Sequence, residues 1–372
     1  MMVLMATIVK CYVGCNAGAA DPQALHVLSC DTETGEVRIE QSVTGVEGTT
    51  YFQLDDEKKY LYSMLRQSPA NGGAANSSLA VRFPVGPGGL LGAMERLCEL
   101  PAEAPCHIAL SHDCSRVFTA SYLSGTVLSY KTDGSALRSY ILPDDDMGSN
   151  LKRQKKAYAH FVFCTPPSRS PARLGVIDLG CDRIRFFDPE TLAVDSSLEI
   201  KFDSGDGPRH AVWSKDGRFL YVLNELDSSV SAFSFDGKAF VCIDKKSMLP
   251  SGFSRWESDA ATLATKAAAI KMTSDGKILM ASNRGHDSIA FYSVDQQTGS
   301  LELKNIQKLA GAFPRDFELM PGEKFMIVGH KMSNEIQVYR FDREKCTLEP
   351  AGKPILCWRP LCFKFAVLPA GD

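Results

Sequence analysis

The stretch from Gly207 to Asp236 reads GPRHAVWSKDGRFLYVLNELDSSVSAFSFD and predicts three successive β-strands. Residues 208–214 alternate apolar and polar side chains, and an apolar run over residues 219–223 follows the Asp216-Gly217 turn. A third run, residues 230–235, alternates again. Alternation with a period of two is typical of strands, and Asp-Gly between two such runs is typical of a hairpin. The stretch is therefore an antiparallel meander.

The polarity of this meander indicates which side chains meet. In antiparallel neighbours, the start of the first strand and the end of the second lie at the same edge of the sheet. Arg209 and His210 stand at the start of the first strand, and Glu225 directly follows the second. We therefore expect these three side chains to converge on one face.

The same pattern recurs along the chain at intervals of about 50 residues. A seventh opening, at Pro360, has no following strands, and matching strands are predicted at the other end, over Thr7–Val13 and Leu25–Ser29. Seven units closed in this way predict a seven-bladed β-propeller of four-stranded antiparallel blades, because a closed ring leaves few exposed sheet edges. Residues 1–47 and 355–372 would together form the closing blade. The other openings stand at residues 48, 105, 158, 207, 266 and 314.

Composition agrees with one all-β domain over residues 1–372. Hydrophobic residues make up 44% of the chain, which is enough for a large core, and only the alanine-rich residues 259–269 suggest a helix. With 41 Lys and Arg against 44 Asp and Glu, the net charge of −3 argues against nucleic acid or an anionic membrane as a partner. No apolar run reaches the ~20 residues of a membrane span, and the N-terminus lacks the charged leading region of a signal peptide. We expect a cytoplasmic protein, either a monomer or a weak homo-oligomer.

The twelve cysteines are scattered, mostly at apolar strand positions. They form no Cys-x-x-Cys pair, and no histidine stands at a spacing suited to zinc. This pattern indicates buried thiols in a reducing compartment. The sequence therefore predicts neither a metal nor a cofactor.

Charged and histidine side chains gather at first-strand starts and second-strand ends, on the face opposite the hairpin turns. Five of the seven histidines are among them. Singly, each has a structural explanation, such as a histidine that caps a strand or an arginine paired with an aspartate. Because these side chains surround one opening in a protein of net negative charge, together they predict an anion-binding funnel. They are His107, His160, Arg209, His210, Glu225, Arg284, His286, Arg315 and His330.

Two loops lead to the same face. The basic run at residues 152–156 precedes His160, and it is either a solvated loop or a segment that attracts an anion. The connection at residues 249–265 carries Arg255 and Trp256 and could partly cover the opening.

Several motifs resemble the propeller-type lactonase family, which includes bacterial 6-phosphogluconolactonases and muconate-lactonizing enzymes. They are Gly207-Pro208-Arg209-His210, Asn224-Glu225-Leu226 and residues 281–289, ASNRGHDSI. The resemblance covers nearly the whole chain. It implies a seven-bladed propeller with an active site at one mouth of its channel. The first full blade departs from the family pattern, with Gly48-Thr49-Thr50 in place of Asn-Pro-Ser and Leu65-Arg66 in place of Asn-Glu.

By motif, the resemblance places the catalytic roles on His160, Arg209, Glu225 and Arg284. Opening a lactone requires an activated water, stabilisation of the oxyanion and a proton for the departing ring oxygen. Either Glu225 or His160 can serve as the base, while an arginine, always charged, holds the oxyanion. The remaining cationic groups would bind the substrate's anionic group. They are His107, His210, His286 and Arg315.

The function that we expect is hydrolysis of a small anionic sugar-acid lactone, with 6-phosphogluconolactone of the pentose phosphate pathway as the substrate. The absence of a Gly-x-Ser-x-Gly elbow argues against an acyl-enzyme. Two alternatives stay open. Cycloisomerisation of a carboxylated muconate would use the same four residues. A non-catalytic interaction propeller is the other, although the Trp-Asp signature of WD repeats is absent.

Overall fold

The computed structural model describes residues 8–16, 24–46, 48–66, 78–103, 105–256 and 264–367. Their strands form seven antiparallel sheets, as the repeats predicted. The described chain divides into two compact units. The first unit comprises Met1–Leu65, Ala80–Arg96 and Ala310–Asp372, and the second comprises Arg66–Leu79 and Leu97–Leu309.

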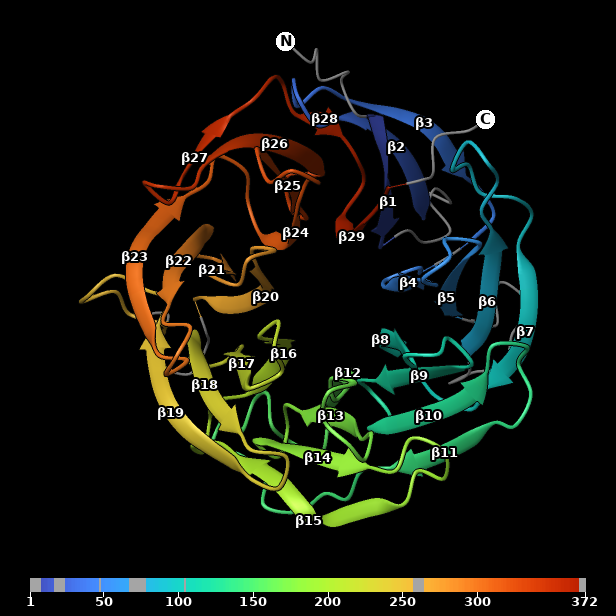
Figure 1. Ribbon diagram of the computed structural model, residues 1–372, viewed down its shortest axis with the longest axis vertical. Helices are drawn as coiled ribbons and strands as arrows, with labels where there is room; N and C mark the ends of the chain where they lie inside the picture. Colours follow the sequence, from blue (N-terminus) through green and yellow to red (C-terminus); the bar gives the residue numbers. More distant parts are fainter. Residues whose placement is uncertain are drawn as a thin grey trace. The chain divides into compact units, whose positions relative to one another are not determined.

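Four sheets lie wholly in the second unit, and each has four strands in chain order from its inner strand outward. Figure 1 shows the first strand of each sheet innermost in this unit and the fourth outermost. The sheets are β8 (Pro105–Leu110), β9 (Arg116–Ser121), β10 (Thr126–Lys131) and β11 (Arg138–Ile141); β12 (Ala159–Cys164), β13 (Leu174–Asp178), β14 (Arg183–Phe187) and β15 (Val194–Lys201); β16 (Pro208–Trp213), β17 (Phe219–Asn224), β18 (Ser229–Phe235) and β19 (Phe240–Ser247); and β20 (Lys266–Met272), β21 (Ile278–Arg284), β22 (Ser288–Val294) and β23 (Leu301–Lys308).

Two of the three remaining sheets also keep chain order, whereas the third begins with β29 and continues with β1, β2 and β3. Two of the three lie wholly in the first unit. In one of these two, the short strand β28 pairs with β26 in addition to the four-stranded path. The sheets are β4 (Phe52–Leu54), β5 (Tyr60–Arg66), β6 (Ser78–Pro84) and β7 (Glu95–Leu100); β24 (Pro314–Leu319), β25 (Phe325–His330), β26 (Glu335–Asp342), β27 (Thr347–Pro350) and β28 (Ile355–Leu356); and β29 (Pro360–Ala366), β1 (Ile8–Cys15), β2 (Leu25–Asp31) and β3 (Val37–Val43).

The two ends of the chain share one sheet. Strand β29 pairs antiparallel with β1, in a register that sets Phe363 opposite Val13 and Ala366 opposite Lys10. Figure 1 shows this sheet with the first three strands of the chain beside its last strand. The prediction that the two ends of the chain share one blade is therefore confirmed. Its start at residue 355 is not, because Ile355 and Leu356 form β28, which pairs with β26.

A β-bulge recurs at the start of the inner strands. The ladder between the first and second strands shifts register after Pro105, Ala159 and Pro208 in the second unit and after Pro314 in the first. Each shift inserts one extra residue into the first strand, and bulges re-aim the side chain of such a residue. The extra residues are Cys106, His160, Arg209 and Arg315.

The core lies between neighbouring sheets. Strand β17 is buried along its whole length, whereas the outer strand β19 is mostly half-buried or exposed. Between the β16–β19 and β20–β23 sheets, Tyr221, Leu279 and Tyr292 belong to one fully buried cluster. Strand β17 therefore reads as a continuous apolar run over residues 219–223, because both of its faces are covered.

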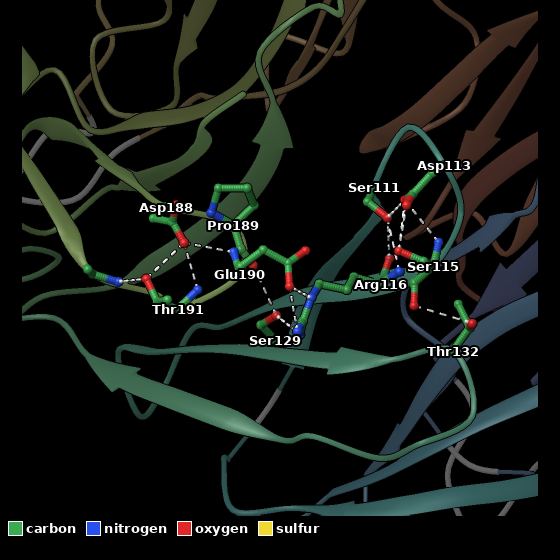
Figure 2. Close-up of polar contacts among 11 residues, drawn as sticks. Ser111, Asp113, Ser115, Arg116, Ser129, Thr132, Asp188, Pro189, Glu190 and Thr191 are labelled. Atoms are coloured by element: carbon green, nitrogen blue, oxygen red, sulfur yellow. Dashed lines mark hydrogen bonds and ion pairs between the residues drawn. The ribbon is translucent and has the colours of Figure 1, made fainter. Parts of the chain in front are cut away.

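A buried arginine joins two sheets on the side of the hairpin turns (Figure 2). Arg116 begins β9, and its guanidinium lies 2.8 Å from the Glu190 carboxylate in the turn after β14. Its Nη1 also donates to Ser129 Oγ at 3.2 Å. The same turn is fixed by Asp188, whose Oδ1 accepts from the backbone and hydroxyl of Thr191.

The predicted helix is wrong where the structure describes it. Residues 259–263 of that prediction lie outside the described residues, but residues 266–269 belong to β20. Ala267, Ala268 and Ala269 are buried in the sheet packing, and tertiary context overrides alanine's helix propensity.

No helix among the described residues has the length and hydropathy that a membrane span requires. The twelve cysteines all lie among the described residues and form no disulfide there. Seven are buried and four are half-buried, but the prediction of buried thiols is wrong for Cys242, which is exposed on the outer strand β19.

Candidate active site

The candidate site, in the second unit, is centred on a buried carboxylate that contacts three arginines. Glu225 directly follows β17, and its side chain is 3% exposed. Its Oε2 lies 2.9 Å from Nε of Arg209 and 2.8 Å from Nη2 of Arg284, while its Oε1 accepts from Nη2 of Arg153 at 2.6 Å. The three arginines come from the bulge of β16, the end of β21 and the loop before β12. We call these four residues the Glu225 cluster.

The arginines decide the ionisation of Glu225. Burial by itself would raise the pKa of this carboxyl group, but the charges of Arg284, Arg153 and Arg209 outweigh burial and hold the pKa well below its ordinary value. His160 contributes in the same direction. Glu225 is therefore a carboxylate at neutral pH. Three positive groups and one negative group leave the cluster with a net charge of about +2.

Backbone carbonyls fix two of the arginines from the other side. Arg209 donates from Nη1 to the carbonyl of Ala268. Arg284 donates to the carbonyls of Lys266 at 3.2 Å and Ala267 at 2.6 Å. Alanine side chains in β20 leave room for the guanidinium groups to approach the backbone closely. The local sequence that suggested a helix therefore positions two of the arginines.

Three histidine rings lie together beside these arginines. The ring centroids of His160 and His210 are 5.4 Å apart, and those of His107 and His210 are 5.7 Å apart. Arg209 Nη1 lies 2.9 Å from His210 Nε2, and an arginine can only donate, so this nitrogen accepts and the ring proton is on Nδ1. His107 Nδ1 accepts from the amide of Val162 at 3.3 Å, which places its proton on Nε2.

Aromatic side chains flank the third arginine. Arg153 is 28% exposed, more than Arg209 or Arg284, and its Nη2 donates to the Tyr122 hydroxyl at 3.4 Å. Tyr122 stacks on Tyr158 with ring centroids 4.5 Å apart and meets the His160 ring edge-on. Burial raises the pKa of Tyr122, so its hydroxyl stays protonated and can donate.

The 249–265 connection reaches this region, as the sequence predicted for its described part. Trp256 packs against Leu179 and Leu226 in the same cluster as Tyr122 and Tyr158. A hollow of about 650 Å³ lies beside this connection, and its lining includes Asp227, Lys245, Phe253 and Arg255. No member of the Glu225 cluster lines that hollow.

The structure brings six of the predicted site residues together. They are His107, His160, Arg209, His210, Glu225 and Arg284. His286 has a different setting, because its Nδ1 lies 2.8 Å from Ser288 Oγ and its ring meets Phe253. Burial, and then the charge of Lys308, lowers the pKa of His286. Arg315 and His330 belong to the first unit, so their part in the site stays a prediction.

Sequence reasoning missed Arg153 and Tyr122 as individual site residues. A signal for Arg153 was present, since the basic run at 152–156 leads into this face. Tyr122 also had a signal: it follows Ser121 at the end of β9 just as Glu225 follows Asn224 at the end of β17. Equivalent positions in repeated sheets point toward the same region.

Comparison with known proteins gives the family. Residues 10–365 match the family model described as lactonase, 7-bladed beta-propeller. An uncharacterised protein of Staphylococcus epidermidis is 28% identical over 329 residues, which is 87% of this chain and 90% of that protein. A periplasmic gluconolactonase of Pseudomonas aeruginosa shares the fold, with a TM-score of 0.83, 22% identity and coverage of 98% and 100% of the two chains. A Bacteroides fragilis protein provisionally assigned as a 6-phosphogluconolactonase aligns with a TM-score of 0.79 and 25% identity, over 97% and 98% of the chains. The chain, with its seven antiparallel sheets and shared terminal sheet, belongs to the lactonase family of seven-bladed β-propellers.

Proposed function

We propose that the protein hydrolyses a sugar-acid lactone that carries an anionic group, with 6-phosphogluconolactone as the favoured substrate. One observation carries this proposal: the Glu225 cluster keeps a net positive charge beside three histidine rings. A local excess of cationic groups in a protein of net charge −3 favours an anionic substrate. The gluconolactonase activity named for the Pseudomonas aeruginosa protein supports a sugar-acid lactone as the substrate, whereas the anionic group is inferred from the cationic residues alone. The favoured substrate would place the reaction in the pentose phosphate pathway.

The ionisation of Glu225 favours an anchoring role over a role as the base. A general base works best with a pKa near the operating pH, and the pKa of Glu225 lies well below its ordinary value. Glu225 also contacts three arginines at 2.6–2.9 Å, so it fixes their positions. We assign to Glu225 the orientation of the guanidinium groups.

His160 is our choice for the base that activates water. It is the extra residue of the β12 bulge, and its ring lies between Tyr122 and His210. A histidine titrates close to neutral pH and can return its proton to the departing ring oxygen. Arg153 and Arg284 would then stabilise the anionic substrate and the oxyanion. A lactone is an activated ester, so positioning and charge can suffice without a covalent intermediate.

Turnover of lactones by the purified protein tests the proposal. We expect hydrolysis of both gluconolactone and 6-phosphogluconolactone above the spontaneous rate, with a higher kcat/KM for the phosphorylated substrate. Arg153→Ala should lower kcat/KM for the phosphorylated lactone by roughly 10–100-fold, because a charge-assisted hydrogen bond contributes about 1.5–3 kcal/mol.

Lys155→Ala is the matched control. Lys155 belongs to the same basic run and is exposed, so its removal changes the net charge equally and leaves the contacts of Glu225 in place. Equal losses in the two variants would show that the run acts only through long-range charge. A wild-type protein without turnover of any lactone would contradict the proposed function and favour an interaction propeller.

A further inference from the structure

Three buried side chains with metal-binding atoms meet in the first unit. Cys15 ends β1, His26 lies in β2, and Cys357 lies between β28 and β29. One ligand atom from each residue lies within 4.8 Å of the other two. The exposed fractions of Cys15, His26 and Cys357 are 0%, 4% and 3%. The fold therefore joins residues that are up to 342 positions apart in the sequence.

The spacing of the two sulfur atoms suits a bound metal. Cys15 Sγ and Cys357 Sγ are 3.5 Å apart. Two thiolates at ~2.3 Å from a tetrahedral zinc ion lie about 3.8 Å from each other. A small outward movement of the sulfurs would therefore produce the zinc geometry.

One ring nitrogen of His26 is held by a hydrogen bond, as is usual for histidines that bind a metal through the other nitrogen. His26 Nδ1 lies 2.9 Å from Ser42 Oγ. This hydrogen bond orients the ring and leaves Nε2 as the nitrogen that can bind a metal. Ser42 itself is exposed, on the neighbouring strand β3.

We propose that Cys15, His26 and Cys357 form a zinc site. Thiolate and imidazole ligands select zinc or copper(I) over the hard cations magnesium and calcium. Two thiolates balance the two positive charges of zinc, and a neutral site avoids the cost of an uncompensated buried charge. Binding would release the two thiol protons. Three protein ligands leave the fourth zinc position to water or an added ligand.

The site would tie the last part of the chain to the first. Cys15 and His26 belong to the sheet β29-β1-β2-β3, whereas Cys357 follows β28, which pairs with β26. Backbone hydrogen bonds already hold this region, from Cys357 to the carbonyl of Asn334 and from Asn16 to that of Arg359. The ligands are therefore preorganised, and we expect zinc to stabilise the shared terminal sheet.

Metal content and cobalt spectroscopy test the proposal on the full chain. Protein purified under reducing conditions with zinc should hold about one zinc ion per chain by elemental analysis. Cobalt(II) added to the metal-free protein should give a thiolate-to-cobalt charge-transfer band. Zinc should also raise the Tm of the metal-free protein by about 3–5 °C.

Four variants separate binding from folding. Cys15→Ser and Cys357→Ser should lose the cobalt band. Cys30→Ala removes a buried thiol of the same sheet outside the site, so it should lower Tm and keep the metal. Ser42→Ala should weaken zinc binding by roughly 10–100-fold and leave the Tm of the metal-free protein unchanged. Because Ser42 is exposed, this variant stays informative if the cysteine variants fail to fold.

Two results would overturn the proposal. The first is a fully reduced protein that binds neither zinc nor cobalt. The second is a Cys15–Cys357 disulfide without metal, seen by mass spectrometry as the loss of two hydrogens. Neither readout depends on lactone turnover.

Discussion

Glu225 is the residue on which the assignment of catalytic roles depends. If it anchors the three arginines, Glu225→Gln should raise KM by roughly 10–100-fold and change kcat by less than about 10-fold, because the substrate-binding guanidinium groups lose their partner. If Glu225 is the base, kcat should instead fall by about 10²–10⁴-fold at unchanged KM. Steady-state kinetics on the phosphorylated lactone distinguish these results. We expect the first.

The pH profile gives an independent test of the base. A histidine base produces an acid limb in kcat/KM at about pH 6–7. Since the pKa of Glu225 lies well below its ordinary value, this limb should persist in Glu225→Gln. His160→Asn should abolish most of the turnover at all pH values. Loss of the limb in Glu225→Gln would return the role of base to the carboxylate.

Stability should also depend on Glu225 in a defined direction. A carboxyl group whose pKa is lowered by folding stabilises the native state above its unfolded pKa, and this contribution is lost as pH falls through the folded pKa. Glu225→Gln should therefore cost about 3–5 kcal/mol at pH 7 and at pH 5, because it removes the negative charge that compensates the buried arginines. The cost should shrink only in stronger acid. Urea unfolding at each pH measures it, with the exposed Glu349→Gln as the control.

Strand polarity predicted most of the Glu225 cluster, but not Arg153. Arg209 and Arg284 belong to a first strand and a second strand, so their positions follow from period and direction. Arg153 lies in a loop whose path depends on tertiary hydrogen bonds, such as that from Gln154 to the carbonyl of Leu179. A periodic pattern carries no information about such a path.

At the scale of elements, Arg116 connects β9 to the turn after β14 through its ion pair with Glu190. Arg116→Ala should lower the free energy of unfolding by about 1–3 kcal/mol, because it removes a buried side chain and its bond to Ser129. Glu190→Ala should cost less than about 1 kcal/mol, since the Glu190 side chain is 66% exposed and water can replace it. Chemical denaturation of the two variants measures this difference. Equal costs would show that the ion pair itself carries the stabilisation.

Strand β20 shows where element prediction failed. Alanine favours helices in isolated peptides, and the same residues also matched a first-strand opening. Burial between sheets decided the outcome in favour of the strand. The recurrent turns and openings, by contrast, were sufficient to predict the strand order of the repeats, because they fix direction as well as position.

At the scale of the molecule, the shared terminal sheet predicts an all-or-none effect of truncation. Ending the chain at Trp358 removes β29, which pairs with β1 and covers part of the core through Phe363. We expect this truncation to abolish cooperative thermal unfolding, measured by circular dichroism. Ending the chain at Val367 keeps β29 and is the control. A cooperative transition in the shorter protein would contradict the prediction.

The pairing of β29 with β1 also determines how long β1 waits for this partner during translation. Lys10 leaves the ribosome 356 residues before its partner Ala366. At about 5–20 residues per second, that separation corresponds to roughly 20–70 s of translation. Throughout this interval one edge of β1, an apolar strand, has no neighbour, and unpaired strand edges attract other chains. We therefore expect nascent chains to be prone to association through this edge until β29 has been synthesised.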